Sequence, residues 1–215
     1  MDYKLEDIFN LKKVNQILER IASTFDVAVV MVDYEGVPVV SSHNFRLFCL
    51  AARSNPEERK RCVKCDVFAG LEAVRLNRPL LYCCHNNIVN ASVPIVVGDN
   101  YLGAILLGQV IIEDSSEKIR VPSLLSGSDS SETWRNNRLN EYIDDLYEQV
   151  PKIEYSKLEK LALLIDSFTQ YTIEQAVAMQ RNRQNYEHVL RCASPSVGAV
   201  QDSAAYGDTV KSHSP

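Results

Sequence analysis

The feature that most constrains the fold of this chain is a group of thiols that gather in one part of the sequence and suit a single site. Five of the six cysteines fall within one short stretch that ends in a histidine; these residues are Cys49, Cys62, Cys65, Cys83, Cys84 and His85. Thiolate and imidazole groups are ligands for zinc and other soft or borderline metals, and thiols also carry out redox chemistry. The intervals between Cys49, Cys62 and Cys84 are long enough for a fold to bring these residues together.

Two spacings within the stretch favour a metal site. Cys62 and Cys65 are three residues apart near the start of a predicted helix, so both sulfurs lie on one helix face. With Cys49 and Cys84 they would supply four thiolates for a closed tetrahedral zinc site or an iron–sulfur cluster, and His85 could replace one sulfur. Cys83 and Cys84 point to opposite sides of a predicted strand, so we expect only one of them to be a ligand. Redox-active thiols and plain packing of buried cysteines are the alternatives.

The ends and the charge of the chain indicate a compartment and exclude some functions. The N-terminus begins with acidic residues instead of a signal peptide, and the apolar runs are too short to span a membrane. We therefore expect a cytoplasmic protein with reduced thiols, where a Cys-x-x-Cys pair is metal-binding or catalytic. The net charge of −5 argues against nucleic-acid binding. We interpret the basic residues 59–61 and Lys64 as local compensation for thiolate charge.

Catalysis finds no support in the sequence. The chain has no Gly-rich phosphate loop, no His-Glu-x-x-His and no Gly-x-Ser-x-Gly motif. Cys84 and His85 are adjacent, so as strand neighbours they would face opposite ways and could not form a nucleophile–base pair. We predict a protein that is not an enzyme.

The periodicity of apolar residues predicts a mixed α/β (α+β) domain with an antiparallel sheet flanked by helices. Residues 80–84, 88–97 and 101–112 follow as strands after an earlier strand pair at 27–32 and 37–40. Helices are predicted at 11–25, 45–53 and 57–77. Residues 113–138, rich in Ser and Gly, are expected to form a loop or flap over the sheet.

A heptad pattern begins after residue 155 and predicts a long C-terminal helix over residues 154–191. Its apolar and polar seam positions are Leu158, Leu161, Ile165, Phe168, Thr172, Gln175 and Met179. Such a seam packs on the sheet, pairs with a second chain, or does both, and we favour a parallel homodimer. Residues 192–215 are small and polar and are expected to be disordered. The predicted organisation is therefore a core at 1–153, a helix at 154–191 and a tail at 192–215.

Several short motifs, in order, resemble the PocR sensory domain over about residues 5–180. The motifs are Phe48-Cys49, Arg53-Ser54, Arg61-Cys-Val-Lys-Cys-Asp66, Tyr82-Cys-Cys-His85, Val93-Pro-Ile95 and Gly108-Gln-Val110. The resemblance implies a PAS-like ligand-sensing module of the kind found at the N-terminus of AraC-type transcription regulators and histidine kinases. It also implies a ligand among small hydrocarbon derivatives such as diols. The positions that carry over are Cys49, Cys62, Cys65 and Cys84, with His85 and Asp66 beside them.

The chain departs from this family in two places. Asn86-Asn87-Ile88 follows the Cys-His pair where the family usually has small residues, often Ala-Gly-Leu, so the family's ligand is not assumed here. In addition, the last residues are too few and too polar for a helix-turn-helix output domain. We therefore expect the chain to act through an output protein in trans or to be a truncated regulator.

These observations together predict a cytoplasmic sensor of a small, largely uncharged metabolite. The pocket is expected between the sheet, the 45–77 helices and the 113–138 loop, and its polar contacts are Tyr82, Asn86, Asn87 and Gln109. A cysteine-ligated metal, zinc or alternatively an iron–sulfur cluster, would brace this pocket. The alternatives are an iron–sulfur or thiol redox sensor and a zinc-stabilised interaction scaffold.

Overall fold

The structure, a computed structural model, describes residues 3–113, 121–124 and 140–193. It divides into one compact unit that ends at Ala178 and a second that begins at Met179. The fold described below belongs to the first unit.

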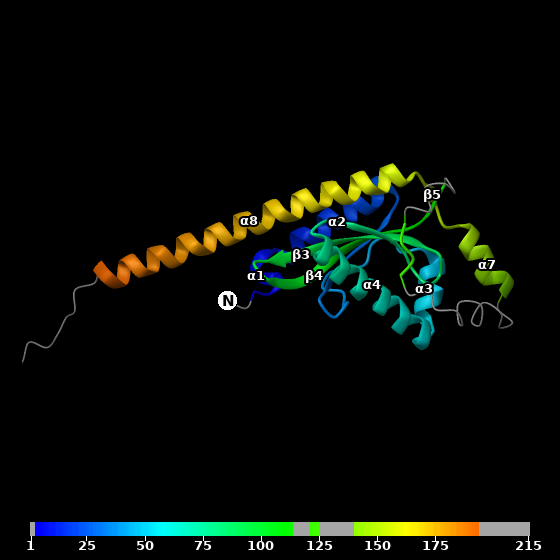
Figure 1. The fold of residues 1–215 in the computed structure, drawn as a ribbon, viewed down its shortest axis with the longest axis horizontal. Helices are drawn as coiled ribbons and strands as arrows, with labels where there is room; N and C mark the ends of the chain where they lie inside the picture. The colour runs from blue at the N-terminus through cyan, green and yellow to red at the C-terminus, as the bar shows by residue number, and fades with distance from the viewer. Residues whose placement is uncertain (1–2, 114–120, 125–139, 194–215) are drawn as a thin grey trace, which may run out of the picture. The chain divides into compact units, whose positions relative to one another are not determined.

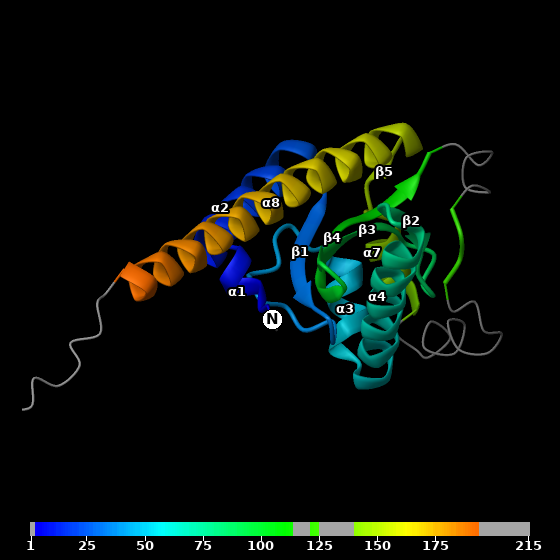
Figure 2. The same cartoon turned by 60° about the vertical axis from the view of Figure 1, so that its left-hand side comes forward.

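The first unit is built on an antiparallel sheet with the strand order β1–β4–β3–β2 (Figures 1 and 2). A short fifth strand, β5, pairs in parallel with the end of β4. In the register of the sheet, Ile105 of β4 lies opposite Met31 on one side and Val93 on the other. The strands are Ala28–Asp33 (β1), Leu80–Cys83 (β2), Val89–Val97 (β3), Asn100–Ile112 (β4) and Lys152–Ile153 (β5).

Helices cover both faces of this sheet. On one face α2 and the first part of α8 run side by side, and α3 and α4 lie on the other face (Figures 1 and 2). The helices are Leu5–Ile8 (α1), Leu11–Phe25 (α2), Leu47–Ser54 (α3), Pro56–Leu76 (α4), Asn140–Glu148 (α7) and Tyr155–Ala193 (α8). The predicted fold class, including the long C-terminal helix, is therefore confirmed.

The alternation of side chains along each strand divides the core between the two faces. Met31 and Ile105 point to the α2 and α8 side, where Leu18 and Ile165 meet them in the main hydrophobic cluster. On the opposite face, Leu80 and Tyr82 pack with the small residues of α4, which are Ala69 and Ala73. Small side chains on α4 allow the helix to lie close to the sheet.

The predicted strand at 37–40 does not form. Pro38 makes only an isolated bridge to Val32, and His43 makes another to Val29. The Asp33 N–H donates to Val37 O at 2.9 Å and the Val39 N–H donates to Met31 O at 3.0 Å, so the segment pairs with the edge of β1 on either side of Pro38 without forming a continuous strand. The sequence reasoning also did not predict α1, α7 or β5.

Only part of the predicted 113–138 loop falls among the described residues. Within it, Ser123 bridges Cys83 in parallel, with the Cys83 N–H donating to Pro122 O at 2.9 Å and the Leu124 N–H donating to Cys83 O at 2.9 Å. Residues 121–124 therefore lie along the open edge of β2. The remainder of the predicted flap, 114–120 and 125–138, lies outside the described residues. The predicted disordered tail at 192–215 begins too early, because Cys192 and Ala193 still belong to α8, and its remainder, 194–215, lies outside the described residues.

The buried face of α8 follows the predicted heptad seam only at its start. Leu158, Leu161 and Ile165 are buried, but the buried line then continues through Thr169 and Ile173. The next seam residue, Phe168, is 42% exposed. A straight helix repeats every 3.6 residues, so its buried face drifts away from a strict heptad.

Candidate functional site

The site lies on the sheet face that α3 and α4 cover, where the end of β2 approaches both helices. Asn55 separates α3 from α4, and its side-chain oxygen accepts hydrogen bonds from the backbone N–H groups of Glu57 and Glu58. This cap starts α4 directly after α3 ends, so Cys49 on the first helix comes close to Cys62 on the second. The fold therefore brings together cysteines that are distant in sequence.

The four predicted thiol ligands interact with one another electrostatically. Burial, the largest cause, raises the pKa of Cys49 to about 12 and that of Cys62 to about 11, and neighbouring thiols add to the rise. Burial also raises the pKa of Cys65 and Cys84, and Cys84 interacts with both Cys49 and Cys65. As folded, these groups are neutral thiols near pH 7, and a neutral thiol is a poor nucleophile.

Cys83 and Cys84 diverge, as the strand alternation predicted. Cys83 packs against the main cluster on the α2 and α8 side, whereas Cys84 packs on the α3 and α4 side. Cys83 is therefore on the opposite side of the sheet from the other cysteines of the site.

The donor types suit zinc or an iron–sulfur cluster, but the described part of the chain contains no group of three or more His, Cys, Asp or Glu side chains arranged to hold a metal ion. Instead, Cys65 Sγ lies 3.6 Å from Nδ1 of His85 and 3.7 Å from Leu124 O. The assignment of Cys49, Cys62, Cys65, Cys84 and His85 as ligands thus stays a prediction. It requires the thiol side chains to rotate toward a common point.

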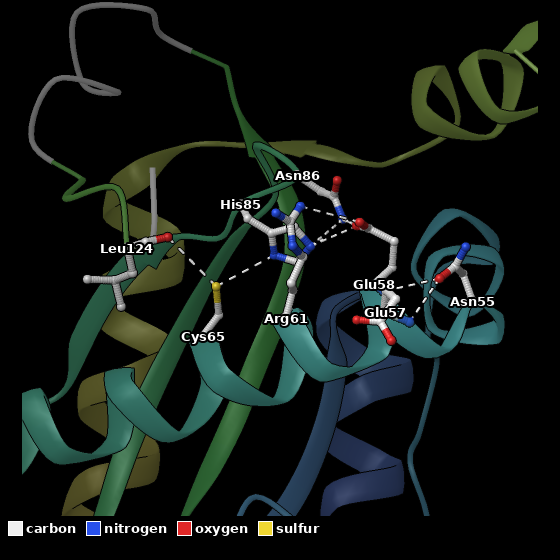
Figure 3. Close-up of polar contacts among 8 residues, drawn as sticks. All are labelled: Asn55, Glu57, Glu58, Arg61, Cys65, His85, Asn86 and Leu124. Atoms are coloured by element: carbon white, nitrogen blue, oxygen red, sulfur yellow. Dashed lines mark hydrogen bonds and ion pairs between the residues drawn. The ribbon is translucent and has the colours of Figure 1, made fainter. Parts of the chain in front are cut away.

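A buried carboxylate, Glu58, organises the polar side of the site (Figure 3). Its Oε2 lies 3.0 Å from Nε2 of His85 and accepts a hydrogen bond from Asn86 Nδ2 at 3.4 Å, while Oε1 pairs with Arg61 at 3.4 Å. The Glu58 side chain is only 5% exposed. Burial lowers the pKa of His85, which outweighs the opposite effect of the hydrogen bond and charge of Glu58. Glu58 therefore ties the first turns of α4 to the turn after β2.

A second buried carboxylate, Asp66, joins three elements. The Tyr82 hydroxyl of β2 donates to its Oδ1 at 2.8 Å, and Arg53 Nη2 of α3 donates to its Oδ2 at 2.7 Å. Burial raises the pKa of Tyr82, and the Asp66 charge raises it further. Burial works to lower the pKa of Arg53, but Asp66 and the nearby thiols outweigh it and raise this pKa. The three side chains form one charge-assisted connection between α3, α4 and β2.

The four predicted ligand contacts fall into different surroundings. Tyr82 and Asn86 belong to the Asp66 and Glu58 networks, and their polar groups bond to protein. Gln109 belongs to another network, where its Oε1 accepts from the Arg46 N–H at 2.7 Å and its own N–H donates to Asn90 Oδ1 at 3.0 Å. Asn87 is exposed in the turn between β2 and β3. Among the described residues, these four side chains therefore do not share one hydrogen-bond network, and their role as ligand contacts stays a prediction.

The sequence reasoning missed Glu58 and the role of Arg53. The Glu58–Arg61 spacing of three residues is a visible signal for an ion pair on a helix. Such pairs are usually exposed, so the burial of Glu58 depends on the strand turn that covers it. The Arg53–Asp66 pair leaves no local signal because the two residues stand on different helices.

Comparison with known proteins gives a consistent picture. A model of the family described as "Sensory domain found in PocR" matches residues 7–177. The regulatory protein PocR of Salmonella typhimurium strain LT2 is 28% identical over 151 residues, which cover 69% of this chain and 46% of that protein. The match thus spans less than half the length of this relative. No solved structure matches the chain. None of the described helices is long and apolar enough to cross a membrane.

Proposed function

Because this chain belongs to the PocR family of sensory domains, we propose that it senses a small metabolite, of the diol or small hydrocarbon class, for a transcription-regulatory or signal-transduction system. The module would bind its ligand without transforming it and pass the signal on through α8. The observation that carries this proposal is the way α8 is packed. Its buried residues Leu158, Leu161 and Ile165 share one hydrophobic cluster with strands β1, β3 and β4.

This packing supports a mechanism of signal transfer. Protein interiors are close-packed, so a ligand that changes the spacing between the sheet and the helices must also change how α8 packs on the sheet. A ligand that binds one packing arrangement of α8 more tightly than another shifts the equilibrium between the two arrangements by its difference in affinity. The helix would then present a changed C-terminal part to its partner.

We propose a second copy of this chain as that partner. In the second unit, the exposed side chains Met179, Tyr186 and Val189 are separated by seven and three residues, which is the spacing of a heptad seam. A parallel pairing through these residues would cover them. Light scattering of the full chain should give the dimer mass, and Met179→Asp with Tyr186→Asp should give the monomer mass. A monomeric unmodified chain would contradict the pairing.

The cysteine cluster supports a structural role better than a chemical one. The raised pKa values of Cys49 and Cys62 keep these thiols protonated, which gives the redox-sensor alternative no support. A bound zinc ion would deprotonate its ligands and join α3, α4 and the end of β2. We propose this brace as an addition to the Glu58 and Asp66 connections. A zinc-stabilised scaffold without a ligand is the alternative that the experiment below must separate.

Thermal unfolding of the full chain in the presence of 1,2-propanediol, 1-propanol and propionate tests the sensor proposal. A ligand that binds only the folded state raises Tm with the logarithm of its concentration above Kd. We expect such a rise with a neutral compound, larger than the general solvent effect of equal concentrations of sucrose. If none of the three compounds raises Tm more than sucrose does, the scaffold reading replaces the sensor reading.

A further inference from the structure

A hollow of about 320 Å³ lies at the open edge of the sheet, beside β2. Leu80 and Leu81 form its floor and belong to opposite faces of the sheet, so the hollow lies where the two helical layers meet. The end of α4 forms one wall, Leu124 forms another, and the first turns of α8 close it with Ala162 and Leu163. Its size falls within the range of small-molecule sites, which is about 300–1,000 Å³.

We propose that this hollow, defined by Leu80, Leu81, Leu124, Ala162, Leu163 and the rim carboxylates Glu72 and Glu159, is the ligand site. The occupant is a small neutral molecule with a short apolar body and hydroxyl groups that donate hydrogen bonds. This inference rests on the proposed sensor function and gives it a location. That location differs from the Tyr82, Asn86, Asn87 and Gln109 set expected from the sequence.

The chemistry of the walls selects this class of ligand. The floor and walls are leucine, proline and alanine side chains, which favour an apolar body. The polar side chains that line the hollow are Glu72, Glu159, Arg78 and Tyr155, so it offers carboxylate acceptors and also N–H and O–H donors. Hydroxyl groups on the ligand both donate and accept hydrogen bonds, so they suit this mixture.

The charges at the rim select against an ionic ligand. Glu72 already accepts a hydrogen bond from Arg75 Nε at 2.8 Å, and Arg78 also lines the hollow. Glu159 accepts a hydrogen bond from Tyr155 at 3.2 Å, which leaves further acceptor positions on its carboxylate. An anion would face Glu72 and Glu159, and a cation would face Arg78, so a neutral molecule meets the least repulsion.

Two walls of the hollow connect it to the rest of the mechanism. Ala162 is fully buried next to the α8 residues that pack into the core, so an occupant would press directly on the output helix. Leu124 lines the hollow with its side chain, while its carbonyl oxygen lies 3.7 Å from Cys65 Sγ (Figure 3). A molecule bound there would therefore contact α8 directly and the cysteine cluster through Leu124.

Two adjacent exposed leucines on α8 provide a matched test. Leu163 lines the hollow and is 50% exposed, whereas Leu164 is 59% exposed and points elsewhere. We expect Leu163→Trp to fill the mouth of the hollow and to weaken binding of 1,2-propanediol at least about tenfold, a change of about 1.4 kcal/mol. Leu164→Trp should bind it as the unmodified chain does. Both variants should fold, because neither position is in the core.

Methyl NMR of the full chain during a 1,2-propanediol titration locates the site directly. Saturable shifts centred on Leu80, Leu81, Leu124 and Ala162 would support the hollow. Shifts centred on Asn86 and Asn87, or equal binding by both tryptophan variants, would overturn the hollow and leave the sensor function standing. If neither 1,2-propanediol nor 1-propanol produces saturable shifts anywhere, both the hollow as a neutral-ligand site and the sensor function are overturned.

Discussion

The hydroxyl of Tyr82 offers the sharpest test of how the site is held together. The ring is fully buried, and the hydroxyl donates to the Asp66 carboxylate at 2.8 Å. Tyr82→Phe removes this one hydrogen bond while it keeps the ring and its packing. Arg53 still pairs with Asp66, so the carboxylate is not left alone. The substitution therefore isolates one charge-assisted bond.

The expected cost follows from the kind of bond that is lost. A hydrogen bond to a charged group contributes about 1.5–3 kcal/mol to the free energy of unfolding. For a chain of this size, 1 kcal/mol shifts Tm by about 2–4 °C, so Tyr82→Phe should lower Tm by about 3–12 °C. The small end of the range applies if water enters and replaces the hydroxyl.

Urea unfolding followed by circular dichroism measures this cost. Tyr142→Phe is the matched control because Tyr142 is 61% exposed, so it should change the free energy of unfolding by less than about 0.5 kcal/mol. If Tyr82→Phe costs no more than this control, the Tyr82–Asp66 bond does not hold β2 to α4. The same variant also tests the expected ligand role of Tyr82. A stability loss with an unchanged response to 1,2-propanediol would assign the hydroxyl to structure alone.

Three further predictions address α8, His85 and the cysteines. Ile165→Ala should lower the free energy of unfolding by about 2–5 kcal/mol, because Ile165 is buried. Leu164→Ala, at an exposed position, should change it by less than about 0.5 kcal/mol. Equal effects of the two substitutions in urea unfolding would refute the packing of α8. Burial lowers the pKa of His85 below its ordinary value of 6.5, so below pH 6.5 the unfolded chain binds more protons at this residue than the folded one. Stability should therefore fall as the pH falls through this value, and His85→Gln should flatten the dependence in pH-resolved thermal unfolding; an unchanged profile would contradict it. Finally, the purified chain should contain one equivalent of zinc, and the double variant Cys62→Ser with Cys65→Ser should contain none. A brown protein would indicate an iron–sulfur cluster instead. The absence of metal from both preparations would refute the metal brace.

The elements with the clearest periodicity were the ones that the sequence predicted correctly. The α2 helix has an amphipathic pattern and an Asn10 cap that accepts the Lys13 N–H, and β3 and β4 are long apolar runs joined by a tight turn. The predicted strand at 37–40 does bond to β1 through Val37 and Val39, but its pairing is limited to an isolated bridge at Pro38. The short α1 and β5 carry too few residues for a periodic signal.

The sequence also grouped residues at the site that the structure separates. Cys49, Cys65 and Cys84 pack on the side that α3 and α4 cover, whereas Cys83 packs on the other side, and the role of the thiols as metal ligands stays a prediction. The four expected ligand contacts were grouped by polarity alone. The fold uses Tyr82, Asn86 and Gln109 to satisfy buried partners, because a buried polar group without a hydrogen bond is costly.

By itself, the sequence determined the long helices and the main strands, which cysteines could share a site, and which family the chain belongs to. These properties depend on local periodicity and on motif order, which one chain carries in full. Only the tertiary structure decided that Glu58 and Asp66 are buried carboxylates whose hydrogen bonds connect α4 to neighbouring elements, and that a hollow opens between β2 and α8. Burial depends on which surfaces meet across long sequence separations, and those contacts leave no local pattern in the residues that make them.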